Sequence, residues 1–271
     1  MDQTSYICIT CGTRFSESEK EPISCPICMD DRQYIRPGGQ AWTTLEVMKN
    51  AGYRNEQLPL EPRLTEIVTR PSFAIGQRAL LLKTEDGNFL WDCTTYLDDK
   101  TVEWMRQKGG LKGIVISHPH FYSNYAGWGE ALDCPVYLHE ADRDWVMGPK
   151  DKIQFWSGDE YRLTSNVTAV RLGGHFPGST FLHWREGAEG KGSILTGDTI
   201  FVTPGLDRVS FMYSFPNHIP LPAQEMQRIR LVIEGWDFDH IHGAWSGRSI
   251  TGDGKAITLR SIDHYLGMLE G

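Results

Sequence analysis

Short apolar runs separated by turn residues recur along this chain of 271 residues, and they predict most of its β-strands. Two such runs between positions 78 and 92 flank the polar sequence Glu-Asp-Gly-Asn, which is typical of a β-hairpin. Further strands are predicted at 112–117, at PVYLH (135–139) and at HIHGA (240–244). Strands and turns are expected to dominate residues 153–202.

Helices are predicted where apolar positions recur every three or four residues. They are expected at 43–52, where Gly52 ends the helix, and at 99–108, 124–132, 221–234 and 256–269. Residues 36–43 are rich in glycine and proline and are predicted to be a linker. Strands that alternate with helices in this way indicate an α/β or α+β fold.

Four polar residues follow predicted strands and have the chemistry of metal ligands. His118 and His120 lie in ISHPHFYSN, His175 lies in LGGHFPGST, and Asp198 lies in LTGDTIF. Ligands of layered α/β proteins converge at strand ends, so separate segments can contribute to one site. Three imidazoles and a carboxylate suit zinc or another borderline divalent ion. The sequence therefore predicts one metal site built from these four side chains.

The order of these segments resembles the metallo-β-lactamase superfamily, whose pattern is HxHxDH, a GHTPGS-like turn, GDTLF and a late histidine in a GH turn. Here HPHFYS, GHFPGS and GDTIF occupy the first three places. Asp92, in FLWDCTT, matches the acidic residue that follows an early hairpin in the family. The resemblance covers roughly residues 60 to 265. It implies a four-layer αββα sandwich.

The departures from that pattern concern the second metal of the family. Tyr122 and Ser123 stand where the family has aspartate and histidine, and the late ligand position falls most naturally on Ala244. Tyrosine and serine are poor zinc ligands, so one catalytic metal is expected. Two further histidines are candidates for the site. His242 is either a ligand or part of a buried strand, and His218 lies in a Pro-rich loop.

The resemblance implies a metallohydrolase in which a metal-bound hydroxide attacks the carbonyl of a small ester, lactone or amide (lactam). Asp198 would bind the metal or orient the hydroxide, and Asp92 would fix a histidine tautomer. Tyr122 would either donate a hydrogen bond to developing charge or simply pack. Two alternatives remain: an iron-dependent oxidoreductase, and a non-catalytic binding protein that retains the sandwich.

A second cluster of metal-binding residues lies near the N-terminus. Two CxxC pairs, Cys8–Cys11 and Cys25–Cys28, are separated by 13 residues. Four thiolates at this spacing predict a structural zinc site. The sequence predicts a zinc-ribbon-like segment at 1–36, whose fold depends on its metal, followed by a metallo-β-lactamase-like domain at 37–271.

The sequence around the cysteine pairs, CxxCG and CPxC, also resembles that of rubredoxin, which holds iron, although the stretch between the pairs is shorter here. We therefore expect one catalytic and one structural zinc, with iron as the alternative at either site. Cys93 and Cys134 stand alone and are expected to be buried thiols. The other histidines are expected to be structural or to lie on the surface: His139, His183, His240 and His264.

Composition narrows the choice of partner. The net charge of −8 and the isoelectric point near 5.6 argue against a nucleic-acid-binding surface. No apolar run is long enough to cross a membrane, and the first residues do not form a secretory signal. Unpaired cysteines indicate a reducing compartment, so a cytoplasmic location is expected. The expected partner is a small-molecule substrate, and the oligomeric state is open.

Overall fold

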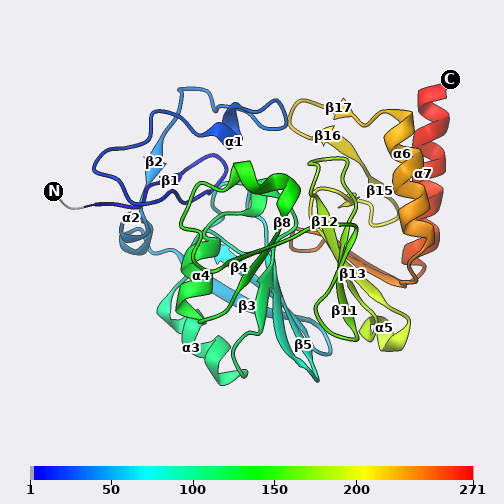
Figure 1. The fold of residues 1–271 in the computed structure, drawn as a ribbon, viewed down its shortest axis with the longest axis horizontal. Helices are drawn as coiled ribbons and strands as arrows, with labels where there is room; N and C mark the ends of the chain where they lie inside the picture. The colour runs from blue at the N-terminus through cyan, green and yellow to red at the C-terminus, as the bar shows by residue number, and fades with distance from the viewer. Residues whose placement is uncertain (1–2, 271) are drawn as a thin grey trace. The chain divides into compact units, whose positions relative to one another are not determined.

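A computed structural model describes residues 3–270 and divides the chain into two compact units. The first unit extends to Leu138 and includes Arg143–Phe155; the second consists of His139–Asp142 and the chain from Trp156 onward. The predicted boundary between residues 36 and 37 does not separate these units. The reason is that the four-cysteine segment shares hydrogen bonds and packing with the rest of the first unit. Figure 1 shows the order of elements along the chain.

The first unit is organised by a seven-stranded sheet in the order β3-β4-β5-β6-β7-β8-β9. The strands are β3 (Arg54–Glu61), β4 (Leu64–Arg70), β5 (Ala79–Thr84), β6 (Gly87–Trp91), β7 (Gly113–Val115), β8 (Val136–His139) and β9 (Ile153–Trp156). Strands β3 to β6 pair antiparallel, and the predicted hairpin at 78–92 is confirmed as β5 and β6. Strands β6, β7 and β8 are parallel, so their carboxyl ends lie at one edge.

Short helices and a small ribbon complete the first unit. The predicted helices form at α2 (Leu45–Asn50), α3 (Asp99–Gln107) and α4 (Tyr125–Ala131). The Thr44 hydroxyl and the Asp98 carboxylate cap α2 and α3 by accepting backbone N–H bonds, as is usual at helix N-termini. The remaining elements are β1 (Ile7–Cys8), β2 (Trp42–Thr43), α1 (Pro26–Met29) and two 3₁₀ turns, Pro119–Phe121 and Glu140–Trp145.

The second unit contains a six-stranded sheet in the order β10-β11-β12-β13-β18-β19. Its strands are β10 (Glu160–Arg162), β11 (Val167–Arg171), β12 (Thr180–Trp184), β13 (Ser193–Thr196), β18 (His240–His242) and β19 (Ser249–Thr251). Two small hairpins form from β14 (Phe201–Val202), β15 (Val209–Ser210), β16 (Met212–Ser214) and β17 (Ile219–Pro220). Strands β13 and β18 pair in parallel, so the residues that follow them meet at one sheet edge.

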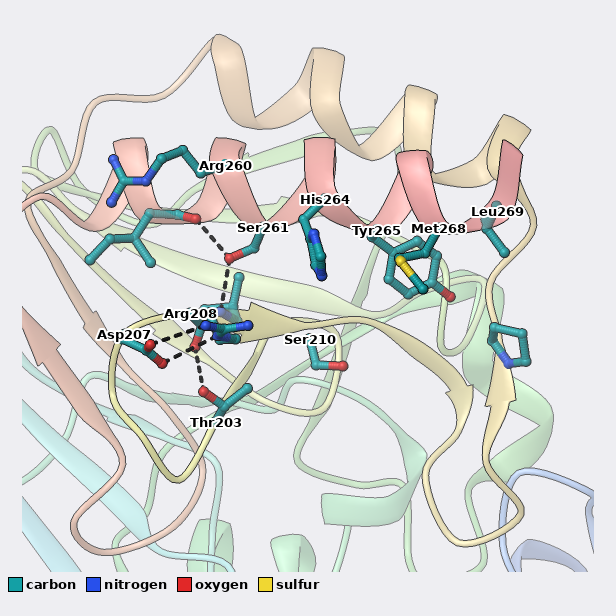
Figure 2. Close-up of a pocket in the computed structure, with 13 residues that line it drawn as sticks. Thr203, Asp207, Arg208, Ser210, Arg260, Ser261, His264, Tyr265, Met268 and Leu269 are labelled. Atoms are coloured by element: carbon teal, nitrogen blue, oxygen red, sulfur yellow. Dashed lines mark hydrogen bonds and ion pairs between the residues drawn. The ribbon is translucent and has the colours of Figure 1, made fainter. Parts of the chain in front are cut away.

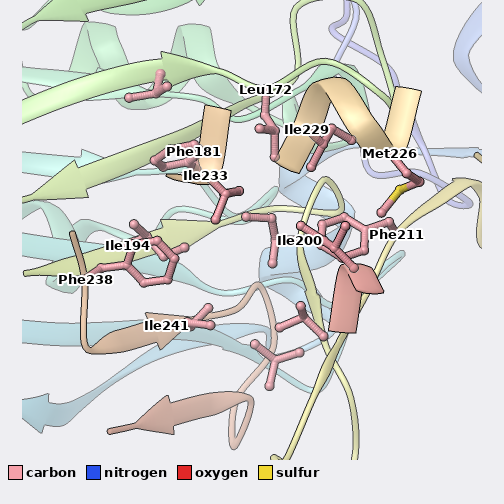
Figure 3. Close-up of a cluster of buried hydrophobic side chains, with 14 of the residues drawn as sticks. Leu172, Phe181, Ile194, Ile200, Phe211, Met226, Ile229, Ile233, Phe238 and Ile241 are labelled. Carbon is pink, nitrogen blue, oxygen red and sulfur yellow. The ribbon is translucent and has the colours of Figure 1, made fainter. Parts of the chain in front are cut away.

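The core of the second unit lies between its sheet and two helices, α6 (Ala223–Glu234) and α7 (Gly254–Glu270). A short irregular turn, α5 (Gly187–Gly190), precedes β13. Ile229 and Ile233 of α6 pack with Phe181 and Ile194 of the sheet, as Figure 3 shows. All four side chains are fully buried, and each contributes roughly 1.5–3 kcal/mol through burial of its apolar surface.

None of the helices at residues 3–270 combines the length and apolar character that a bilayer-spanning segment requires.

Candidate metal centres

The four cysteines of the N-terminal segment lie together and face one point. The Sγ atoms of Cys8 and Cys28 are 3.7 Å apart, and those of Cys11 and Cys25 are 3.6 Å apart. Tetrahedral zinc with Zn–S bonds of about 2.3 Å places its sulfurs about 3.8 Å from one another. A disulfide would bring two sulfurs to about 2.05 Å, and all four cysteines are free thiols. The geometry therefore fits a single tetrahedral ion.

The cysteine cluster lies in a small apolar core of its own. All four cysteines are buried, and Ile27, Phe15 and Trp42 pack against them. Hydrogen bonds among the four sulfurs hold the pKa of Cys8 well below its usual range, with the largest effect from Cys11, and raise the pKa of Cys11 well above it. The thiolate that forms when a thiol such as that of Cys8 ionises is the form that binds a metal.

Two histidines of the predicted catalytic site follow strand β7 of the first unit. His118 and His120 are buried, and their ring centroids are 5.2 Å apart. His120 lies in a 3₁₀ turn at Pro119–Phe121, and a ring nitrogen of His118 and one of His120 lie within 4.8 Å of each other. The ring of Phe121 packs on His118 with centroids 4.4 Å apart. The first unit therefore presents a buried pair of imidazoles beyond the end of strand β7.

Asp92 supports His118 through an intervening serine. Asp92 follows β6, the strand beside β7, and its Oδ1 accepts the Ser117 backbone N–H at 2.8 Å. The Ser117 hydroxyl lies 3.1 Å from Asp92 Oδ2 and 2.8 Å from His118 Nδ1. An ionised carboxylate only accepts, so the serine donates its single proton to Asp92 and accepts from His118 Nδ1–H. His118 then carries its lone pair on Nε2, the atom available for a metal.

Tyr122 and Ser123, the two departures from the family pattern, are both buried. The Ser123 hydroxyl accepts a hydrogen bond of 2.6 Å from Gln77 Nε2, and its backbone adopts a positive φ of 43°. The Tyr122 ring packs near Tyr125, with centroids 6.2 Å apart. Ser123 thus has a structural role in holding the loop, in agreement with its poor quality as a ligand.

The second unit holds the other two predicted ligands. His175 is buried, and its Nδ1 lies 2.8 Å from the carbonyl oxygen of Tyr213. A carbonyl only accepts, so Nδ1 is protonated and Nε2 carries the lone pair. That Nε2 is 3.7 Å from Asp198 Oδ2. Two ligand atoms on one ion, each about 2.0–2.2 Å from it, are separated by a similar distance. His175 and Asp198 are therefore spaced as two ligands of a shared metal.

His242 lies at the same sheet edge as Asp198. It is the last residue of β18 and pairs with Leu195 of β13, while Asp198 follows β13 by two positions. His242 is buried, and its Nδ1 is 3.1 Å from Ser249 Oγ. The reading of His242 as part of a buried strand is therefore confirmed, and its role as a metal ligand stays a prediction. By contrast, His218 is exposed in the turn between β16 and β17.

Two of the histidines expected to be structural, His139 and His183, are buried and form hydrogen bonds with backbone groups. His139 donates from Nε2 to Gly158 O at 3.0 Å and accepts the Ala141 N–H, and burial lowers its pKa. His183 donates to a carbonyl at 2.8 Å, and burial lowers its pKa as well. His240 is half-buried and His264 is exposed.

The two isolated cysteines are buried, as expected. Burial raises the pKa of the Cys93 thiol above its usual range and that of Cys134 to about 12. Neutral thiols in these positions pack as small apolar groups.

Sequence patterns did not point to several residues that orient the candidate ligands. Ser117 was part of the strand run, and its relay to Asp92 depends on strand pairing. In the second unit, Asp142 Oδ1 accepts the Gly178 N–H at 2.9 Å and holds the turn that follows His175. A Cβ at Gly178 would lie 2.7 Å from Asp142 Oδ2, so the turn requires glycine there. Asp142 carried no sequence signal because it lies in an unremarkable acidic stretch.

The comparison with known proteins places this arrangement in a family. Over 242 residues the chain is 47% identical to a Bacillus subtilis (strain 168) protein named "Uncharacterized protein YmaE", covering 89% of this chain and 88% of that protein. This chain belongs to the YmaE family. No protein-family model matches the sequence.

Solved structures establish the fold of this YmaE-family chain. TMB-1 is similar with a TM-score of 0.59 and 14% identity, covering 78% of this chain and 98% of that chain. DIM-1 metallo-β-lactamase is similar with a TM-score of 0.57 and 12% identity, covering 80% and 97%. The metallo-β-lactamase FIM-1 from Pseudomonas aeruginosa, in a mono-zinc form, gives 0.57 and 12% over 78% and 96%. The predicted metallo-β-lactamase fold is therefore confirmed.

The second unit of the YmaE-family chain also contains a groove, and none of the candidate metal ligands lines it. It has a volume of about 670 Å³, within the range of small-molecule pockets. Figure 2 shows His264 and Tyr265 of α7 on one side and Ser210 of β15 on the other. Arg208 and Asp207 both line the groove and form an ion pair at 3.2 Å. No predicted metal ligand lines this groove, so the groove is not part of the candidate metal centres.

Proposed function

We propose that this chain is a metal-dependent hydrolase in which His118, His120, His175 and Asp198 bind one divalent metal. The observation that carries the proposal is the orientation of the imidazoles within each unit. His118 and His175 each engage Nδ1 with an acceptor and leave the Nε2 lone pair for a metal. The metallo-β-lactamase fold of the chain supports the same assignment.

The chemistry follows from the ligand set. A divalent metal, when bound, acidifies water and polarises a carbonyl oxygen. The neutral histidines leave the positive charge of the site largely uncompensated, and Asp198 supplies one negative charge or accepts a proton from water. Ser117 and Asp92 keep His118 in the tautomer that a ligand requires. This set suits attack on the carbonyl of a small ester, lactone or lactam.

We propose that the site is mononuclear and holds zinc. The support is that Tyr122 and Ser123 stand in place of a carboxylate and an imidazole, and that the Ser123 hydroxyl accepts a hydrogen bond from Gln77. His242 remains the candidate ligand that would allow a second metal. We also propose a cytoplasmic protein that acts on a small molecule and binds neither nucleic acid nor a membrane.

The experiment that tests this function is metal analysis of protein purified without added metal, followed by hydrolysis assays. We expect two zinc ions per chain, one in each centre, and turnover of at least one class among aryl esters, lactones and lactams. Iron with visible absorption, together with oxygen consumption, would instead support an iron-dependent oxidoreductase. One metal, held only by the cysteines, and no turnover would support a non-catalytic binding protein.

Replacing Tyr122 by phenylalanine separates the two roles expected for this residue. If the hydroxyl donates to developing charge, kcat should fall by on the order of a hundredfold while metal content is unchanged. If the ring only packs against Tyr125, the variant keeps the ring and kcat should change less than about twofold. Steady-state kinetics with Tyr125→Phe as the matched control distinguishes these results, because that hydroxyl donates to the Pro149 carbonyl instead.

A further inference from the structure

We propose that the four-cysteine metal centre controls the order of the loop that carries His118 and His120, and that Arg14 transmits this control. The proposal rests on the proposed function only in so far as it concerns metal binding by these histidines. The structural coupling itself lies wholly within the first unit.

The first link joins the cysteine cluster to Arg14. The Cys11 thiol lies 3.3 Å from the Thr13 hydroxyl, and the Cys8 N–H donates to the Thr13 carbonyl at 3.0 Å. The Gly12 N–H donates to the Cys8 carbonyl at 2.8 Å. The cysteines therefore fix the backbone up to the residue before Arg14. Because short cysteine segments fold together with their metal, the position of Arg14 depends on the ion.

The second link joins Arg14 to the histidine loop. Its backbone N–H donates to the Ser123 carbonyl at 2.9 Å, and its guanidinium donates to Asn124 Oδ1 at 3.1 Å. Asn124 is buried and directly precedes helix α4. A Cβ at Gly127 would lie 2.5 Å from Asn124 Oδ1 and 3.0 Å from Arg14 Nη1. Arg14 and Asn124 are therefore packed tightly on α4 at the point where the histidine loop ends.

A third link reaches the loop that carries Asp92. The Thr95 hydroxyl donates to the Gly12 carbonyl at 3.0 Å, and both residues are buried. Gly12 adopts a φ of +82°, and a Cβ there would lie 2.3 Å from Thr95 Oγ1. Only glycine allows this approach. The cysteine segment thus contacts both loops that orient His118.

The consequence is that loss of the cysteine metal should loosen the histidine loop rather than the N-terminus alone. That loop contains only one short 3₁₀ turn, so its order depends on bonds from other segments. Gln77 supplies one of these bonds through Ser123, and Arg14 supplies the two described above. The contacts of the zinc-ribbon-like segment predicted at 1–36 thus give it a second role as a support for the candidate catalytic site.

Hydrogen exchange measured by mass spectrometry tests the coupling directly. In Cys25→Ser, peptides covering 117–124 should exchange at least about tenfold faster than in the native chain, while peptides of α6 in the second unit should be unchanged. Arg14→Ala keeps all four cysteines and should give the same local effect. Lys20→Ala, which removes an exposed cation of the same segment, is the matched control and should have none. Unchanged exchange at 117–124 in both Cys25→Ser and Arg14→Ala would overturn the proposal.

Metal binding provides the second readout. With cobalt as the probe, Arg14→Ala should retain the thiolate-to-cobalt absorption of the cysteine centre but bind the second cobalt about tenfold more weakly. Arg14→Lys keeps one donor toward Asn124 and should recover part of this loss. If the native chain binds cobalt only at the cysteines, the proposed function fails, while faster loop exchange in Arg14→Ala still supports the coupling. Equal cobalt affinity in the native chain and Arg14→Ala would contradict it.

Discussion

Replacing His118 by alanine should remove the metal from the histidine site and abolish hydrolysis, while the cysteine centre keeps its ion. A site with three imidazoles loses a large part of its binding energy with any one of them. The loss should exceed the 10–100-fold that removal of a residue behind a ligand typically causes. Ser117→Ala should fall in that smaller range, because it removes only the relay between His118 and Asp92. Metal stoichiometry and kcat/KM of both variants measure the difference.

The histidine at the end of β18 is the control that tests whether the site is mononuclear. His242→Ala should leave the metal stoichiometry unchanged, although His242 and Asp198 lie at the same sheet edge. If the native chain holds two metals besides the cysteine ion, and His242→Ala loses one of them, the mononuclear assignment is wrong. His264→Ala changes an exposed histidine of α7 and should have no effect on either quantity.

The sequence was most informative where chemistry coincided with an abrupt end of an apolar run. His118 directly follows such a run, and the predicted strand forms as β7, which pairs in parallel with β6. The cysteine spacing was equally informative, because four thiolates within one short segment have few arrangements other than a tetrahedron. Both predictions depended on local pattern, and the structure places the residues accordingly.

Features that depend on distant pairing could not be predicted in the same way. Strands β3 and β4 form a long hairpin, yet β3 reads as a mainly polar stretch because it lies at the edge of its sheet and is only partly buried. Residues 139–142 begin at the last residue of β8 but belong to the second unit, where Asp142 holds the turn after His175. The contact between Arg14 and Asn124 joins positions 110 residues apart. No periodicity in either segment indicates such contacts.

The second large effect concerns stability. Arg78→Met should lower the free energy of unfolding by about 3–5 kcal/mol, because it leaves the Glu66 carboxylate buried without its partner. The Arg78 side chain is fully buried, its Nη1 lies 2.6 Å from Glu66 Oε2, and burial lowers its pKa. Arg78 also directly follows Gln77, the residue that holds Ser123 in the histidine loop. Urea denaturation with the metals retained measures the change in the free energy of unfolding.

The double variant Arg78→Met with Glu66→Met decides whether the loss comes from an uncompensated charge. It replaces both ions by apolar side chains of similar length, so no buried charge remains, and most of the lost stability should return. Arg54→Met is a suitable control, since that arginine pairs with Glu56 at an exposed site and should contribute less than about 1 kcal/mol. If the double variant is as unstable as Arg78→Met, the arginine stabilises the sheet through packing and its other contacts rather than through the neutralisation of Glu66.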